Sequence, residues 1–267
     1  MPPLCIHDRA AIARYLLRNQ DIHLYELGDL DDFFWQYTTW YASCRAGEIT
    51  DLALLYTGTD LPILLASAPE HGSKSSRLDL LNHLLPFLPR RFYSHLSEGL
   101  EAAFTAQYHL TSHGLHLKMT LKNVECLPPQ DARVQPLASG DLPVLQDLYA
   151  SSYPDNWFDP RMLETGQYFG IWRDGQLISA AGVHVYSPQY RVAALGNITT
   201  RPEYRGMGLG TLVTAKLCHS LLNNVDHIGL NVRADNAPAI AIYRKIGFEP
   251  VTQYTEWMAI ARTGISN

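Results

Sequence analysis

Hydrophobic and polar positions are patterned most clearly in the C-terminal half of the chain. Two strand-like runs, 168–172 and 177–186, are joined through Asp174 and Gly175, a dipeptide typical of tight hairpin turns. A third strand is expected over 192–200. The later pattern predicts a helix, a strand, a second helix and two short strands, over 208–222, 228–232, 238–246, 248–251 and 255–260. This order predicts an α/β fold, a mixed sheet covered by helices.

The N-terminal half shows a similar but less regular succession. A hairpin about Gly58 is followed by helical and strand-like segments, expected over 75–88, 92–95, 98–106 and 115–121. Two hypotheses fit this succession, a degenerate duplication and the ordinary alternation of α/β proteins. The segment before the first of these helices, 70–74, contains a single glycine. No phosphate-binding loop is therefore expected in this half.

The best boundary between the two halves is the segment 126–130, Cys-Leu-Pro-Pro-Gln. Two adjacent prolines cannot lie inside a helix or a central strand. A new helix is expected over 139–150, with Pro143 in its first turn. We therefore predict a divergent N-terminal α/β domain over 1–128 and a second domain over 131–267.

Composition excludes several classes of function. Of 267 residues, 46% are hydrophobic and 18% charged, and the net charge is −5, so a nucleic-acid partner is not expected. No signal peptide and no run of about 20 apolar residues is visible, which predicts a cytoplasmic protein without a membrane partner. The four cysteines are widely spaced, so we expect unpaired thiols and no metal site.

The most informative stretch is 201–210, Arg-Pro-Glu-Tyr-Arg-Gly-Met-Gly-Leu-Gly, between an expected strand and an expected helix. Glycines at 206, 208 and 210 let the backbone approach a bulky anion, and the free N–H groups of a helix N-terminus suit a pyrophosphate. We expect no room for a β-carbon at Gly208.

Three phosphate-binding motifs compete for this stretch. A P-loop requires a Gly-Lys-Ser/Thr sequence, but Thr211 follows Gly210 directly, without a lysine. A dinucleotide-binding loop requires a third glycine where Thr211 stands, and an acidic residue that closes the next strand. The third pattern, R-x-x-G-x-G, is met by Arg205, Gly208 and Gly210.

With this loop, residues 150–260 resemble the GNAT superfamily of acyl-CoA-dependent N-acyltransferases. Residues 198–202 are similar to the end of the family's fourth strand, and 236–248 are similar to its second signature, N-x-x-A-x-x-x-Y-x-K-x-G-F. The two signatures occur in the family's order on the expected elements. The resemblance implies a GNAT fold in the C-terminal half, preceded by a smaller, degenerate, GNAT-like half.

The resemblance also implies acetyl-CoA, or a related acyl-CoA, as cosubstrate. In this family the loop backbone holds the pyrophosphate, and the fourth strand binds the pantetheine arm through main-chain atoms, which also suit a developing oxyanion. The matching cofactor-binding residues are Ile198, Thr199, Thr200, Arg205, Gly206, Met207, Gly208, Leu209, Gly210, Thr211, Asn236 and Tyr243. Asn236 also fits the role of a helix N-cap.

Two residues are candidates for acid–base catalysis. Tyr243 matches the family tyrosine that protonates the departing CoA thiolate, although its spacing from Ile240 also fits a packing role. No carboxylate lies in 191–200, where many members place their base. His184 is the best substitute on pKa grounds, with a structural role as the alternative. Glu256, Glu203 and a relay through water are further possibilities for the base.

Several features have a neutral and a functional interpretation. Lys216, Arg244 and Lys245 fit solvated helix faces better than CoA phosphate contacts. The aromatic segment 33–41 fits a core or an interdomain contact better than an acceptor pocket.

The predicted function is acyl transfer, by direct attack, to the amine of a small molecule, amino acid or peptide, by a monomer or homodimer. The alternatives are a non-catalytic acyl-CoA sensor and a longer-chain or aryl acyltransferase similar to the glycine N-acyltransferases.

Overall fold

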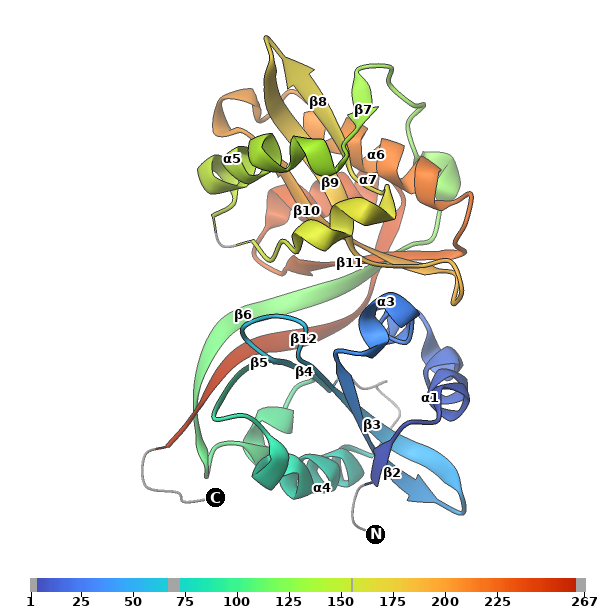
Figure 1. Cartoon of the computed structure of the whole chain (residues 1–267), viewed down its shortest axis with the longest axis vertical. Helices are drawn as coiled ribbons and strands as arrows, with labels where there is room; N and C mark the ends of the chain where they lie inside the picture. The colour runs from blue at the N-terminus through green and yellow to red at the C-terminus, as the bar shows by residue number, and fades with distance from the viewer. Residues whose placement is uncertain (1–3, 67–72, 155, 263–267) are drawn as a thin grey trace. The chain divides into compact units, whose positions relative to one another are not determined.

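The computed structural model describes residues 4–66, 73–154 and 156–262 (Figure 1). The chain divides into two compact units. Unit 1 consists of Met1–Lys118, Arg233–Asp235 and Val251–Asn267, and unit 2 consists of Met119–Val232 and Asn236–Pro250. Of the segment expected to precede the first N-terminal helix, residues 70–72 lie outside the described residues.

Unit 2 is built on a sheet whose strands lie in the order β11-β10-β9-β8-β7. All neighbours are antiparallel except β10 and β11, which run parallel. The β8–β9 hairpin turns at Asp174 and Gly175, whose φ angles of 49° and 76° suit the expected tight turn. The three antiparallel strands are therefore confirmed. The strands are β7 Val134–Pro136, β8 Phe169–Arg173, β9 Gln176–Ser187, β10 Val192–Thr200 and β11 His227–Arg233.

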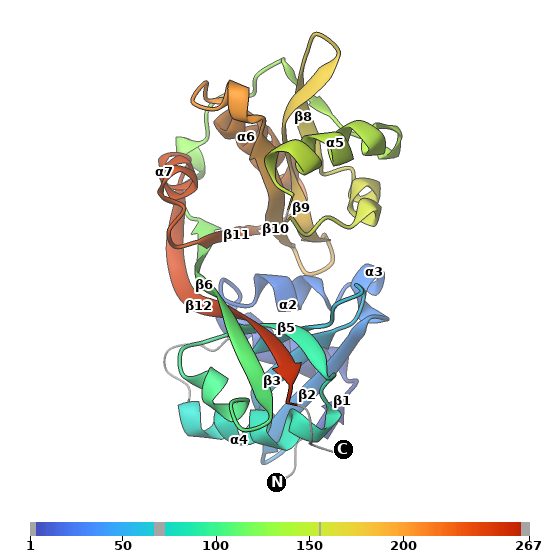
Figure 2. The same cartoon turned by 90° about the vertical axis from the view of Figure 1, so that its left-hand side faces the viewer.

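Helices cover both faces of this sheet. Figure 2 shows α5 (Leu142–Ser152) on one face of β8–β10 and α6 (Leu209–Leu221) on the other. Because both faces are covered, the first six residues of β10 are all buried. Helix α7 (Ala237–Lys245) ends before Gly247, which has a φ of 97°. A β-carbon at Gly247 would lie 2.0 Å from the backbone oxygen of Asn123, so only glycine fits this helix end.

Short 3₁₀ turns connect the elements of unit 2. They are η4 Val124–Cys126, η5 Ser139–Asp141, η6 Pro160–Thr165 and η7 Pro202–Tyr204. The expected helix after the double proline is confirmed, with its α-helical part beginning at Leu142 and Pro143 in the first turn.

The strands of unit 1 lie in the order β1-β2-β3-β4-β5-β12-β6 and include parallel and antiparallel neighbours. Strands β4 and β5 are parallel and are joined through helix α4 (Lys74–Leu84), the same β-α-β connection that joins β10 to β11. The strands are β1 Leu4–Ile6, β2 Thr38–Arg45, β3 Glu48–Tyr56, β4 Ile63–Ala66, β5 Arg91–Leu96, β6 Tyr108–Leu121 and β12 Phe248–Ala261.

The core of unit 1 lies between α4 and the sheet. The rings of Phe92, Phe104 and Tyr108 meet edge to face, with centroids 5.2 to 6.2 Å apart, and pack against the buried leucines of α4. Three short helices precede β2, and 3₁₀ turns follow α1, α4 and β5. These elements are α1 Arg9–Leu16, α2 Leu24–Gly28, α3 Asp32–Trp35, η1 Leu17–Asn19, η2 Leu85–Phe87 and η3 Leu100–Ala103.

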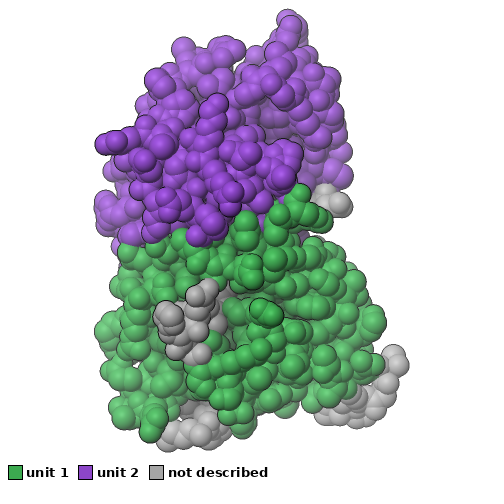
Figure 3. All heavy atoms as spheres, turned by 180° about the vertical axis from the view of Figure 1, so that it is seen from behind, with its two compact units in different colours: residues 1–118, 233–235, 251–267 green, residues 119–232, 236–250 purple. Residues whose placement is uncertain are grey.

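Three expected elements are corrected. The two short strands after Gly247 are one strand, β12, of 14 residues. Its first three residues belong to unit 2 and the remainder to unit 1, the units that are coloured purple and green in Figure 3. The helix expected over 98–106 is only the 3₁₀ turn η3, which begins after Gly99 because the φ of that residue, 82°, lies outside the helical region. Strand β6 begins at Tyr108, not at 115.

Within the described part of the chain, no helix is both long enough and apolar enough to cross a membrane. All four cysteines lie in that part, and each is unpaired, as their spacing predicts.

Candidate active site

The parallel strands β10 and β11 separate before they end. Their pairing runs from Val192 opposite His227 to Leu195 opposite Leu230, although β10 continues to Thr200. On its other side β10 stays paired with β9 as far as Thr200 opposite Ser179. The last residues of β10 therefore present one main-chain edge without a strand partner from β11. Such an edge can bind an extended ligand through backbone hydrogen bonds.

The glycine-rich loop follows directly from this open edge. Gly206 and Gly208 have φ angles of 77° and 76°, a region that residues with a β-carbon rarely adopt. Gly208 is the N-cap of α6, and among the described backbone bonds its oxygen accepts first from Leu212 at 3.2 Å. The N–H groups of the first helical turn are thus available to an anion.

The expected lack of space at Gly208 is wrong. No atom lies within 4 Å of a β-carbon built at Gly206 or Gly208. Glycine is required at these positions by the left-handed backbone conformation, not by crowding. A side chain placed at Gly208 would therefore project into the space in front of the loop.

Two arginines brace the start of the loop. The exposed Arg205 donates from Nε to the oxygen of Thr200 and from Nη2 to that of Ser152, both at 3.2 Å. The buried Arg201 donates from Nε to the oxygen of Leu177 at 3.0 Å and forms an ion pair with Asp147. Arg201 ties the end of β10 to β9 and α5. This role of Arg201 could not be predicted from the sequence, where the residue only precedes Pro202.

Two candidate residues of the second signature, Asn236 and Tyr243, lie at the N-cap and within helix α7. The side chain of Asn236 accepts from the N–H of Ala239 at 3.2 Å, which confirms its expected N-cap role. Tyr243 is 9% exposed and packs against Phe248, with ring centroids 6.0 Å apart. Burial, reinforced by Tyr153, raises the pKa of the Tyr243 phenol, so the hydroxyl stays protonated and can donate a proton.

His184 lies partly buried on β9, and its Nε2 is 3.3 Å from Oδ1 of Asn197 on β10. The other candidate bases differ in setting. Glu203 is exposed in η7. Glu256 belongs to unit 1, where its carboxylate accepts hydrogen bonds from the hydroxyls of Tyr93 and Tyr254 at 2.6 and 3.0 Å.

The remaining candidates have structural roles. Lys216 donates to Oε1 of Gln130 at 2.5 Å, whereas Arg244 and Lys245 are exposed in the last turn of α7, where cations are favourable. From the aromatic segment 33–41, Trp40 is 1% exposed in unit 1.

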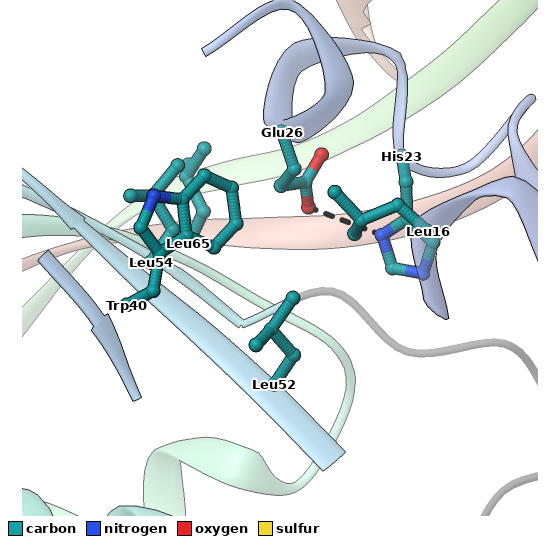
Figure 4. Close-up of a pocket in the computed structure, with 7 residues that line it drawn as sticks. All are labelled: Leu16, His23, Glu26, Trp40, Leu52, Leu54 and Leu65. Atoms are coloured by element: carbon teal, nitrogen blue, oxygen red, sulfur yellow. Dashed lines mark hydrogen bonds and ion pairs between the residues drawn. The ribbon is translucent and has the colours of Figure 1, made fainter. Parts of the chain in front are cut away.

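Trp40 lines a small cavity in unit 1 together with His23 and Glu26 (Figure 4). Its volume of about 10 Å³ is near the minimum for one water molecule, too small for an acceptor. The aromatic segment thus contributes to the core of unit 1, as its pattern favours.

Comparison with known proteins identifies the family. A family profile described as Acetyltransferase (GNAT) family matches residues 135–248. A Bacillus subtilis (strain 168) protein, named as a ribosomal protein bS18 alanine N-acetyltransferase, is 30% identical over 128 residues, which cover 45% of this chain and 82% of that protein. The chain belongs to the GNAT acetyltransferase family. Members of this family in general use acetyl-CoA.

Other GNAT relatives match shorter parts of the chain. A mycothiol acetyltransferase from Tsukamurella paurometabola is 34% identical over 97 residues, which cover 35% of this chain and 33% of that protein. The chain therefore spans about a third of the length of this relative.

The likeness of fold extends to both halves of the chain. A tandem GNAT protein from the clavulanic acid biosynthesis pathway aligns with 99% of this chain and 98% of its own, with a TM-score of 0.58 and 16% identity. At this identity the match shows the fold alone. The expected GNAT fold of the C-terminal half is confirmed, and the likeness to a GNAT protein covers the N-terminal half as well.

Proposed function

We propose that this GNAT protein transfers an acetyl group, or another acyl group, from acyl-CoA to a primary amine by direct attack. The observation that carries the proposal is the open main-chain edge of β10, which leads into a loop with Gly206 and Gly208 in left-handed conformation. An extended pantetheine arm suits the edge, and a pyrophosphate suits the helix N-terminus.

The residues present fit this cosubstrate. Backbone N–H groups of Gly206, Met207, Gly208, Leu209, Gly210 and Thr211 would hold the pyrophosphate, with Arg205 bracing the loop. Main-chain groups of Ile198, Thr199 and Thr200 would hold the pantetheine arm, and Asn236 would lie beside it. Acetyl-CoA, when bound, supplies an acyl group activated as a thioester.

Two side chains would handle protons. Tyr243 would give its phenolic proton to the leaving sulfur, because a phenol is protonated at neutral pH and can act as a general acid. His184 would accept a proton from the incoming ammonium group, since an imidazole titrates near neutral pH. No carboxylate lies on β10, and this supports a histidine in place of the more usual glutamate.

The acceptor is the part of the proposal that needs a direct experiment. Thiol release from several acyl-CoAs would be measured with a panel of amines, amino acids and peptides. The panel includes a peptide with an N-terminal alanine, because the name of the Bacillus subtilis relative mentions alanine of a ribosomal protein. We expect at least one amine to accelerate thiol release, and the acylated amine to appear by mass spectrometry.

A reaction without acceptor measures the hydrolysis of acyl-CoA, which is subtracted as background. The Gly208→Asp variant should lose the acceptor-dependent part of thiol release. Saturable CoA binding with no acceptor-dependent release across the panel would contradict catalysis and favour a non-catalytic acyl-CoA sensor.

A further inference from the structure

Asn231 is the first residue of β11 beyond the point where this strand parts from β10. The last pair between the two strands is Leu195 opposite Leu230, and β11 continues to Arg233. From Gly196 onward β10 has no strand partner from β11. Asn231 therefore lies beside the open main-chain edge on which the proposed function places the pantetheine arm.

The register of the strands places the side chain of Asn231 on a definite face of the sheet. Residues opposite each other share a face, and successive residues of a strand alternate between faces. Because Leu195 and Leu230 are opposite each other, the residues that follow them, Gly196 and Asn231, both point to the other face. A β-carbon at Gly196 would lie 2.2 Å from the ring of His184, so this ring lies on that face too. The His184 ring, from β9, and the Asn231 side chain, from β11, thus lie on either side of β10.

This face of the sheet is the one that α5 covers. Gly182 is the cross-strand partner of Gly196, and a β-carbon there would lie 2.1 Å from the ring of Tyr168. The ring centroid of Phe158 is 5.9 Å from that of Tyr168 and 5.1 Å from that of Tyr149, a residue of α5. Helix α6, which begins at the glycine-rich loop, covers the opposite face (Figure 2). An acceptor on the α5 face can therefore reach the end of β10 without crossing the helix that follows the loop.

The amide oxygen of Asn231 has no partner within the described part of the chain. Its Oδ1 is buried and accepts no hydrogen bond there. Native proteins keep few such atoms, and each calls for an explanation such as a bound molecule or a catalytic role. Among the described residues of unit 2, Oγ1 of Thr120 and Oε1 of Gln167 are in the same condition, but these residues belong to neither β10 nor β11.

The amide of Asn231 can present its oxygen to a ligand at low cost. The residue is half-buried, so its side chain lies at the boundary with solvent. Rotation about the last side-chain bond of asparagine is broad and roughly two-fold, and it exchanges the positions of the oxygen and the nitrogen. The oxygen accepts hydrogen bonds and carries no net charge. A donor of the N–H type would complete it.

We propose that Asn231 binds the amino group of the acceptor, with Oδ1 accepting one of its N–H groups beside the open edge of β10. The inference rests on the proposed transfer to a primary amine. In that reaction the ammonium group loses one proton to a base, and the nitrogen lone pair forms a bond to the thioester carbon. The carbon–sulfur bond breaks and the sulfur takes a proton, while the nitrogen loses a second proton. The third hydrogen remains in the amide product, and this is the hydrogen donated to Asn231.

A neutral amide suits this position better than a carboxylate does. A carboxylate beside the ammonium group would raise the pKa of that group and hold its proton, which must leave before the nitrogen can attack. The oxygen of Asn231 accepts an N–H from both the ammonium and the neutral amine. It can therefore hold the nitrogen through the whole reaction.

Binding is tested by NMR without turnover. The ¹⁵N–¹H signals of the Asn231 side-chain amide are assigned through their loss in Asn231→Leu, and the CoA-saturated parent is titrated with methylammonium chloride. We expect a saturable shift of these signals. Tetramethylammonium chloride has the same charge but no N–H, and it should leave the signals unchanged. No response to methylammonium, or an equal response to both salts, would overturn the proposal.

Asn231→Leu also provides the kinetic test, with the acceptor found in the amine panel. Leucine keeps the size and branching of asparagine but removes the oxygen, which has no partner among the described residues, so thermal stability and CoA affinity should stay parental. The KM for the acceptor should rise about 10- to 100-fold, the range expected when a hydrogen bond to a charged group is lost. An unchanged acceptor KM, or a marked loss of thermal stability, counts against the proposal.

Asn231→Asp supplies a readout that a purely structural role would not change. Its carboxylate should raise the pKa of the bound ammonium group, so the acid limb of the kcat profile should move to higher pH by about one unit. Asn224→Asp is the control, since it makes the same charge change at an exposed turn between α6 and β11. Coinciding profiles of the two variants would contradict a contact between Asn231 and the amine.

This inference and the proposed function fail separately. If no amine in the panel accelerates thiol release but the Asn231 amide responds to methylammonium alone, the acyl transfer is wrong and the amine site stands. If an amine does accelerate release and Asn231→Leu keeps the parental acceptor KM, the amine site is wrong and the proposed function stands.

Discussion

Each unit contains one pair of neighbouring parallel strands joined through a helix, and the two pairs end differently. In unit 1, β4 and β5 stay paired from Ile63–Tyr93 to Ala66–Leu96, the last residue of both strands. In unit 2, β10 and β11 stop pairing at Leu195–Leu230, five residues before the end of β10. The same β-α-β connection is closed in one unit and open in the other.

Polar residues are also used differently in the two units. In unit 1 the carboxylate of Glu256 is held by the hydroxyls of Tyr93 and Tyr254 and lies 3.4 and 3.5 Å from Nε2 of His95 and His116. Its donors come from its own unit, which makes it a structural network. In unit 2 the loop N–H groups face outward from a helix N-terminus. The proposed CoA site therefore belongs to the unit whose parallel strands part and whose loop contains glycines in left-handed conformation.

The strongest test of this comparison is the number of CoA sites. Calorimetric titration should give one CoA per parent chain, because in the described part of unit 1 the parallel strands β4 and β5 stay paired as far as Ala66 and Leu96. Gly208→Asp should remove the site, with affinity lowered at least about 100-fold, since a carboxylate at the helix N-terminus repels the pyrophosphate.

Gly175→Asp is the matched control. Gly175 and Gly208 share a φ of 76° and open space around the β-carbon position, but Gly175 lies in the β8–β9 turn. The control variant undergoes the same backbone strain and should bind CoA as the parent does. Two CoA molecules per chain, or equal losses in both variants, would contradict the comparison.

The next largest effect is expected at Tyr243. Tyr243→Phe keeps the ring that packs on Phe248 but removes the proton donor, so kcat should fall about 10²–10⁴-fold with little change in CoA affinity. Because the pKa of this phenol is raised, the parent should keep its activity at alkaline pH until above the usual tyrosine range. Steady-state kinetics and CoA binding on the same preparation measure both quantities.

Tyr108→Phe in unit 1 is the corresponding control. Tyr108 is 4% exposed, and its hydroxyl donates to the backbone oxygen of Pro89. The variant removes the hydroxyl of a similarly buried tyrosine that belongs to unit 1, so turnover should equal that of the parent. A Tyr243→Phe variant within about threefold of the parent would identify the tyrosine as a packing residue only.

The backbone features of the candidate site in unit 2 are predictable from the sequence because they depend on local signals. Gly206 and Gly208, the cap at Asn236 and the helix end at Gly247 each act within a few residues along the chain. The β8–β9 turn, with positive φ at Asp174 and Gly175, is likewise determined by its own residues. Backbone conformation at such positions is largely a property of the residues themselves.

The features missed in the sequence depend on register between strands. The contact between His184 and Asn197 exists because two bulges fall at neighbouring points of β9 and β10, and no local pattern encodes their coincidence. The paired glycines, Gly182 and Gly196, are a signal only after the register is known. The sequence predicts two strands in place of β12 because the polar residues Thr252 and Gln253 interrupt its apolar pattern.

The smallest expected effect concerns the pH dependence of stability in unit 1. Burial lowers the pKa of His95 to about 4, outweighing the opposite influence of Glu256, while Lys118 and His116 act in the same direction as burial. Between pH 6.5 and 4 the unfolded chain therefore binds a proton that the folded chain does not. His95 stabilises the fold fully above about pH 6.5, and this contribution is lost as the pH falls toward 4.

Urea unfolding at pH 7 and pH 5 measures this loss. Over that interval His95 should account for about 2 kcal/mol, at about 1.4 kcal/mol per pKa unit. His95→Gln, which keeps an N–H donor for Glu256, should remove this part of the pH dependence, whereas His113→Gln, at an exposed position of β6, should keep it. Burial acts to raise the pKa of Glu256, but the pKa is lowered overall, and the hydrogen bonds from Tyr93 and Tyr254 contribute to this whether or not His95 is charged. The titration of Glu256 therefore lies below this window. If the free energy of unfolding falls equally in the parent and in His95→Gln between pH 7 and pH 5, His95 takes up its proton in the folded protein. The polar network of unit 1 would then be accessible to solvent, in contrast to the buried network described above.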